Sequence, residues 1–347
     1  MQIKKKNADI EFLRFFMILA VIILHFSEDY VGIPGILKGG YLGVDFFFIL
    51  SGFFLKKHFD NDNSSLGPFD KSQKYLWYRV KQLWLPYITA IFLYVGTLFI
   101  ENHLNVKWLI QHLWETKWQY LFLHYLGAPV GFEFRSIWFM SALVILSYFI
   151  YFLLCYNEEF YLGLIPVLII IIYVWIYVSY GTLAMQEIYR GILHGSMIRG
   201  FACMSLGVLA YKLSERISSG EISVEFKCPQ GLKIMCFILV LYVMRKYGLD
   251  QNDFAVLPAM FLMTILSYLF PADLPMMIKK VLLYLGDISY WIYVLHLLIS
   301  KWFVLFFPGK SYNVMLPLFI IATIIVSSLL SLLFKAGFYK TLKINGK

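Results

Sequence analysis

The sequence predicts an all-α integral membrane protein with about ten transmembrane helices and both termini in the cytoplasm. Three observations lead to this fold class. Hydrophobic residues make up 60 % of the chain and charged residues only 15 %, whereas about 25 % of a soluble domain is charged. Mean hydropathy is high, at +0.71. Several apolar runs are also close to the roughly 20 residues that a helix needs to cross a bilayer.

The apolar runs use up nearly the whole chain. No segment outside them is long enough for a second folded domain, so we expect residues 1–347 to form a single transmembrane domain. The first run contains Glu11 and Arg14 and lacks a small-residue cleavage site, so we interpret it as a retained helix. In chain order the predicted spans lie near residues 10–27, 41–57, 83–101, 136–156, 161–180, 197–212, 231–247, 254–270, 282–300 and 314–336.

The positive charges orient these spans. With the N-terminus inside, almost twice as many Lys and Arg residues fall on the cytoplasmic side as on the opposite side. Lys and Arg accumulate on the cytoplasmic side of membrane proteins, so the pattern predicts cytoplasmic termini and an even number of spans. The net charge of +9 is therefore a topology signal, and we expect membrane lipids rather than nucleic acid as partners.

Two polar stretches connect the predicted spans. Residues 56–82 form a predicted cytoplasmic loop that ends in a basic interfacial segment. Residues 102–135 form the longest predicted external loop, and within it the aromatic stretch WLIQHLWETKWQYLFLHYL is too polar to span. This stretch predicts an interfacial or re-entrant helix on the outer face.

Metal binding and disulfides are not indicated. The cysteines form no CxxC pair and join no His cluster, so we expect neither a zinc site nor a disulfide framework. They are Cys155, Cys203, Cys228 and Cys236.

The first predicted span carries ionisable residues on one face. Charged groups inside a span are costly and usually face a polar cavity. Arg14 and His25 are separated by three helical turns plus about 20°, and by about 16 Å along the axis. Glu11 precedes Arg14 by three residues, which permits an ion pair. Either these residues form a site, or Arg14 reaches the cytoplasmic headgroups while His25 lies in the outer interface.

Asp45 lies near the outer end of the second predicted span, at about the depth of His25. A carboxylate beside a histidine can orient the ring and raise its basicity. Asp45 could instead cap the start of its helix. Gly43 and Gly52 would allow close helix packing.

Four segments occur in an order that resembles the acyltransferase-3 family of bacterial membrane acyltransferases. The first is EFLRFFMILAVIILH, in which ten residues separate Arg14 from His25. The others are GGYLGVDFFFILSGFFL, which contains Asp45, SIWFMSALVILSY, which contains Trp138, and LGDISYWIYVLHLLI, which ends near His296. Together they extend over nearly the whole chain.

The resemblance implies a multi-pass protein of the bacterial inner (plasma) membrane with ten transmembrane helices. It implies transfer of an acyl group, most often acetyl from acetyl-CoA, to hydroxyls of extracytoplasmic saccharides. His25 matches the residue regarded as catalytic in the family, and Arg14 matches the positive residue of the same motif. The family often has an Arg-x-x-Arg pair before its third helix. Here Arg79 is present but Gln82 stands at the second position, and Lys81 could supply the charge one residue away.

These residues suggest a mechanism. Arg14, Arg79 and Lys81 would bind the CoA phosphates by charge-assisted hydrogen bonds, although Arg79 and Lys81 could equally contact anionic lipid. His25 would act as general base on a saccharide hydroxyl, with an acetyl-imidazole intermediate as an open variant.

Further residues are candidates for contact with the saccharide. His296 could bind the acceptor or pack against a neighbouring helix. Arg199 could bind the saccharide or an anionic substituent on it, or anchor its helix in the interface. Trp138, in the third of the four segments, is the remaining candidate contact. No feature marks a metal or a tightly bound prosthetic group.

Other functions also fit a chain with many helices. One is a transporter or flippase of lipid-linked saccharide, and another is a glycosyltransferase that would use the DxD-like string Asp60-Asn61-Asp62. Within the acyltransferase interpretation the donor could be a different acyl-CoA, such as succinyl-CoA. Residue types do not decide between donors, and they indicate neither the acceptor sugar nor the oligomeric state.

Overall fold

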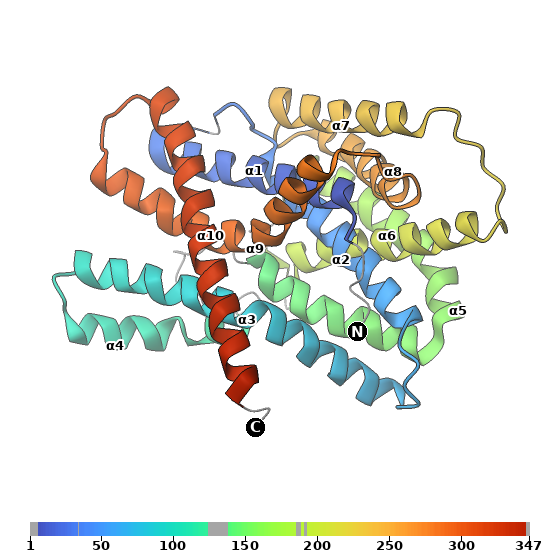
Figure 1. Ribbon diagram of the computed structural model, residues 1–347, viewed down its shortest axis with the longest axis horizontal. Coiled ribbons are helices and arrows are strands. Elements are labelled where there is room, and N and C mark those ends of the chain that lie inside the picture. Colours follow the sequence, from blue (N-terminus) through green and yellow to red (C-terminus); the bar gives the residue numbers. More distant parts are fainter. Residues whose placement is uncertain (1–5, 34, 124–137, 185–188, 191–192, 345–347) are drawn as a thin grey trace.

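The computed structural model describes residues 6–344 except 34, 124–137, 185–188 and 191–192, and for residues 189, 190, 193, 194 and 336–344 it describes the backbone alone. Within these ranges the chain is almost wholly helical (Figure 1). The elements are α1 (Ala8–Val31), η1 (Gly40–Leu42), α2 (Gly43–Asp60), α3 (Pro68–Glu101), α4 (Val106–Glu115), η2 (Lys117–Leu121), α5 (Trp138–Tyr180), β1 (Tyr189–Arg190), β2 (Leu193–His194), α6 (Gly195–Ser218), α7 (Pro229–Lys246), η4 (Gln251–Ala255), α8 (Val256–Leu269), α9 (Met276–Phe306) and α10 (Tyr312–Ile344). The two short strands pair antiparallel.

Helix covers most of each predicted span. The two spans predicted at 136–156 and 161–180 form the single element α5, but Asn157 interrupts it with non-helical dihedrals of φ −160° and ψ 95°. The Asn157 side chain then accepts a hydrogen bond from the Phe160 amide at 2.9 Å, as a residue at a helix start does. The α5 element is therefore two helices joined at a kink.

Six of the described helices are long and apolar enough to cross a membrane: α1, α3, α5, the η4–α8 segment, α9 and α10. Together with the family assignment below, they make this a membrane protein. The number of crossings and the side on which the termini lie stay predictions. The helices α2 and α6 carry more charge, and one charged residue of each, Asp45 and Arg199, pair inside the helix bundle.

The segment 56–82, interpreted above as a loop, is mostly helical. Helix α2 continues to Asp60 and α3 begins at Pro68, so only a short connection separates them. Tertiary packing explains the difference, because Tyr75 in α3 stacks on Tyr151 in α5 with ring centroids 4.3 Å apart. The polar sequence of the segment did not reveal this buried contact.

The segment after α3 folds back along it. His103 and Leu104 adopt positive φ angles at the turn, and Asn105 caps α4 by accepting a hydrogen bond from the Trp108 amide at 3.1 Å. Farther along, Trp84 and Tyr87 of α3 donate to the carbonyl oxygens of residues 120 and 119 at 3.0 Å and 2.8 Å. The expected helix within 102–135 is thus present and runs beside α3 (Figure 1). Its interfacial or re-entrant position in the membrane stays a prediction. Residues 124–135 of that predicted loop lie outside the described residues.

Helices α1 and α9 lie side by side and run in the same direction. Near the start of α1, a Cβ atom on Gly286 of α9 would overlap the Glu11 side chain. Farther along, His25 faces His296, and near the end of α1 the Ser300 hydroxyl donates to Asp29 at 2.7 Å. This parallel pair aligns the two histidine-containing segments along their length.

Candidate active site

The two ends of the α1–α9 pair hold different chemistry. At the end near the N-terminus, Arg14 Nη1 donates to Glu11 Oε2 at 2.9 Å. The predicted ion pair is therefore present. It offsets part of the cost of placing both charges in a helix that is apolar enough to cross the membrane.

At the other end, the rings of His25 and His296 stack with centroids 5.4 Å apart and planes inclined by 29°. His296 is fully buried, whereas 20 % of the His25 side chain is exposed. The structure thus brings together two histidines that are 271 positions apart in the sequence. Of the pair, His25 is the one whose side chain is open to solvent.

Glu28 is the carboxylate beside His25. Its Oε2 atom lies 3.4 Å from His25 Nδ1, so the carboxylate can accept from an Nδ1–H group in a long contact and leave Nε2 available to take a proton. Sequence reasoning missed this residue and assigned the role to Asp45. The spacing of three residues on one helix was the signal that could have found it.

The contacts of His296 define its tautomer. Its Nδ1 atom lies 2.5 Å from the carbonyl oxygen of Tyr293. A carbonyl oxygen only accepts hydrogen bonds, so Nδ1 carries the proton and Nε2 presents a lone pair in the neutral ring. Among the described residues, Nε2 has no hydrogen-bond partner.

The late segment of the motif series forms one face of α9. Gly286, Tyr290 and His296 lie within about 120° of one another around the helix axis. The Tyr290 hydroxyl donates to the carbonyl oxygen of Leu83 in α3 at 2.7 Å. This face of α9 therefore contacts α1 along one side and α3 along the other.

An aromatic chain leads from the histidines to α5 and α2. The Tyr293 ring lies 5.9 Å from His296 and 5.6 Å from Phe139, which in turn lies 4.6 Å from Phe48. Trp138 is only 2 % exposed and packs on Phe48 at 5.9 Å. The geometry gives Trp138 a packing role, and its contact with a saccharide stays a prediction.

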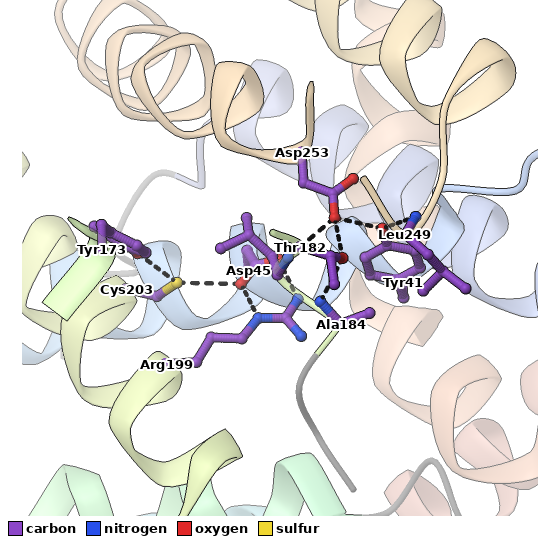
Figure 2. Close-up of polar contacts among 10 residues, drawn as sticks. Tyr41, Asp45, Tyr173, Thr182, Ala184, Arg199, Cys203, Leu249 and Asp253 are labelled. Carbon is purple, nitrogen blue, oxygen red and sulfur yellow. Dashed lines mark hydrogen bonds and ion pairs between the residues drawn. The ribbon is translucent and has the colours of Figure 1, made fainter. Parts of the chain in front are cut away.

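Asp45 contacts Arg199 and not His25, which corrects its expected position (Figure 2). Arg199 Nε donates to Asp45 Oδ1 at 2.6 Å, and Arg199 Nη2 pairs with Oδ2. Both side chains are fully buried. Gly43 packs against Met17 of α1, so Asp45 lies near the depth of Met17, about 12 Å along α1 from His25.

The Asp45–Arg199 pair belongs to a larger buried network (Figure 2). Cys203 Sγ contacts Asp45 Oδ1 at 3.2 Å, and the Tyr173 hydroxyl lies 3.1 Å from the same sulfur. On the other side, the Arg199 guanidinium lies 6.0 Å from the ring centroid of Tyr41. Asp253 Oδ2 accepts from the hydroxyls of Tyr41 and Thr182 and from the Leu183 amide, at 2.6, 2.6 and 3.0 Å. These contacts give Arg199 a structural role, because its side chain joins α6 to α2. Its binding of a saccharide stays a prediction.

The two candidate donor-binding residues of α3, Arg79 and Lys81, point in different directions. Arg79 is partly buried, and its Nε atom has no partner among the described residues. It lies one turn before Leu83, at the contact with α9. Lys81 is exposed and lies about 200° from Arg79 around the helix axis. Arg79 and Lys81 therefore do not share one face.

The DxD-like string has partners within the protein. Asp60 pairs with the fully buried Lys56, and Asp62 accepts from the Ser64 amide at 3.0 Å and the Tyr151 hydroxyl at 3.2 Å. Partial burial raises the pKa of the Asp62 carboxyl, but hydrogen bonds from Ser64 and Tyr151 and the charge of Lys74 together lower it more, so this pKa lies below its usual value. In the described part of the chain, no three His, Cys, Asp or Glu residues are grouped so that they could hold a metal ion.

Comparisons with known proteins agree with the motif series. The chain matches the family model of acyltransferase-3, described as an acyltransferase domain, over residues 7–335. No curated protein and no solved structure matches the chain. The family match covers α1 to α10 and includes both histidines of the stacked pair. The protein therefore belongs to the acyltransferase-3 family and is a membrane acyltransferase.

Proposed function

We propose that this acyltransferase moves an acetyl group from cytoplasmic acetyl-CoA to a hydroxyl of a saccharide on the opposite side of the membrane. The arrangement of α1 supports this proposal. One helix carries a cation, Arg14, and a partly exposed imidazole, His25, on the same stripe. Their separation of about 16 Å along the axis suits an extended pantetheine arm, with the CoA phosphates at one end and the thioester at the other.

At the donor end, Arg14 and Arg79 are the residues that we assign to the CoA phosphates. The partnerless Nε atom of Arg79 leaves a donor for a phosphate oxygen, and arginine binds phosphate through strong charge-assisted hydrogen bonds. Lys81 is exposed on a different face, so its contribution would be long-range attraction of the anionic donor.

At the acceptor end, His25 acts as general base. As the saccharide oxygen forms a bond to the thioester carbonyl carbon, His25 Nε2 takes the hydroxyl proton. The carbon–sulfur bond then breaks, and the proton passes from His25 to the departing CoA thiolate. General-base help of this kind contributes about 10²–10⁴-fold. Glu28, beside Nδ1, favours the cationic imidazole that forms during the step.

The test is ester formation on cell-surface glycan, compared between the wild type and His25→Ala at matched membrane expression. Ester-linked acetyl groups on the purified glycan are followed by NMR. We expect them in the wild type and expect their loss in the variant. His103→Asn is a matched control, because it removes another histidine at a position whose positive φ asparagine tolerates.

The other results lead to different conclusions. Acetyl esters that persist in His25→Ala would remove His25 as the base. A different ester, such as succinyl, would keep the site and change the donor. If no sample carries an acyl ester while glycan export depends on the protein, the proposed acetyl transfer to glycan is wrong.

A further inference from the structure

The His296 imidazole has one nitrogen whose hydrogen-bonding capacity is unused. The ring is fully buried, Nδ1 donates to the Tyr293 carbonyl oxygen, and Nε2 has no partner among the described residues. Buried polar atoms in native proteins nearly always have a partner, and an exception indicates a ligand, a water molecule or a functional role. Because Nε2 presents a lone pair, the missing partner must be a donor.

Among the described residues, no neighbour of His296 supplies this donor. His25 stacks on the ring and uses Nδ1 for its contact with Glu28. Phe139, which continues the aromatic chain beyond Tyr293, has no polar hydrogen to give. An O–H or N–H group of a substrate bound at the edge of the stacked pair would fit.

The proposed acyl transfer restricts which O–H group this is. A hydroxyl has a single hydrogen, and the attacking hydroxyl must direct it to the base, His25. That hydroxyl therefore cannot also donate to His296. A neighbouring hydroxyl on the same sugar ring can donate to His296 instead, because the centroids of the two imidazoles are only 5.4 Å apart.

We infer that His296 Nε2 accepts a hydrogen bond from a second hydroxyl of the acceptor, next to the one that is acylated. The acceptor class is then a saccharide with adjacent hydroxyls, and a sugar with an isolated hydroxyl is disfavoured. This inference rests on the proposed function. It makes His296 a specificity-determining residue, while His25 remains the base.

The experiment combines changes in enzyme and acceptor. Purified protein in liposomes receives acetyl-CoA and methyl hexopyranosides as soluble acceptors, and each is compared with the analogue that lacks the hydroxyl beside the acylated position. A site built to bind a hydroxyl discriminates against an analogue without it. We expect the wild type to prefer the complete sugar by about tenfold in kcat/KM, the usual scale of one hydrogen bond.

Two substitutions separate the two ring nitrogens. His296→Asn keeps an amide donor near the position of Nδ1 and removes the acceptor at Nε2, so the preference for the complete sugar should disappear while KM for acetyl-CoA stays unchanged. His296→Gln places an amide oxygen near the position of Nε2 and should restore part of the preference. A His296→Asn enzyme that keeps the full preference overturns the inference.

A measurement on the wild type covers the case in which the variants do not fold. Nitrogen-15 NMR of histidine-labelled protein reports the tautomer of each imidazole. We expect His296 to be protonated on Nδ1, and we expect its Nε2 resonance to shift when the preferred methyl hexopyranoside is added. A proton on Nε2, or an unchanged resonance with saturating sugar, contradicts the inference and assigns the site to a structural water.

The two proposals fail in distinguishable ways. If the wild-type protein forms no acyl ester with any sugar, the proposed function and this inference are both wrong. If the wild-type protein acylates complete and deoxy sugars equally well, the proposed function stands and only the role of His296 is wrong.

Discussion

The immediate neighbours of His25 decide how its imidazole can act. Glu28 lies on the same helix, one turn away, with its carboxylate 3.4 Å from Nδ1. Asp45, the carboxylate expected to take this role, is instead saturated by Arg199 and Cys203. The contact of Glu28 is long and partly exposed, so its contribution to orienting the ring should be modest.

Glu28→Gln should lower kcat for acyl transfer by about tenfold, a part of the 10²–10⁴-fold that a general base supplies. The amide keeps the size of the side chain but no longer favours the cationic ring. Steady-state kinetics in liposomes measure the effect. Asp29→Asn is the control, since the neighbouring carboxylate binds Ser300. Equal kcat values for Glu28→Gln and the wild type would exclude Glu28 as the orienting group.

Arg199→Ala should destabilise the protein by about 3–5 kcal/mol, because it leaves Asp45 buried without its charge partner. Thermal unfolding in detergent provides the measurement. Arg216→Ala is the matched control, since Arg216 forms an exposed pair with Glu221, and such pairs contribute about 0–1 kcal/mol. If both variants unfold at the same temperature, the buried pair does not stabilise the fold.

At the scale of helices, glycines bring α2 and α6 into backbone contact. A Cβ atom on Gly52 would overlap the Met204 carbonyl oxygen, and one on Gly207 would overlap the Ile49 carbonyl oxygen. Small residues allow this approach in membrane helices. The close contact places Asp45 and Arg199 within bonding distance in the interior, away from lipid.

Gly207→Ala should therefore lower the unfolding temperature, because the two helices must move apart. Gly96→Ala and Gly163→Ala are controls of opposite sign. A Cβ at either position meets nothing within 4 Å, and alanine favours helix over glycine by about 0.5–1 kcal/mol. Thermal unfolding of the three variants at equal detergent concentration checks the signs. A Gly207→Ala variant as stable as the two controls would contradict the close contact.

For the whole molecule, the parallel α1–α9 pair connects the two ends of the proposed reaction. Arg14 and Glu11 lie beside Gly286 at one end, and His25 lies beside His296 at the other. With this geometry, the protein can transfer an acetyl group from cytoplasmic acetyl-CoA to the opposite side only if the Arg14 end faces the cytoplasm. The predicted orientation is therefore part of the mechanism.

Maleimide labelling of intact cells tests the orientation. We expect a membrane-impermeant maleimide to label Val106→Cys, at the exposed start of α4, and to leave the exposed native Cys228 unlabelled. Permeabilised cells should show labelling at both positions. Labelling of Cys228 from outside intact cells would invert the topology and place His25 on the cytoplasmic side.

The sequence by itself determined the class, the positions of the helices and the family. Apolar runs indicate helices because, in a bilayer, the backbone N–H and C=O groups must bond to each other within the segment. The alignment of Arg14 and His25 on one face follows from helical periodicity within one segment. The tertiary structure decided which side chains meet across helices. It paired Asp45 with Arg199 and His25 with His296, and it made most of 56–82 helical. Such contacts depend on packing between segments far apart in the chain, which periodicity within one segment does not encode.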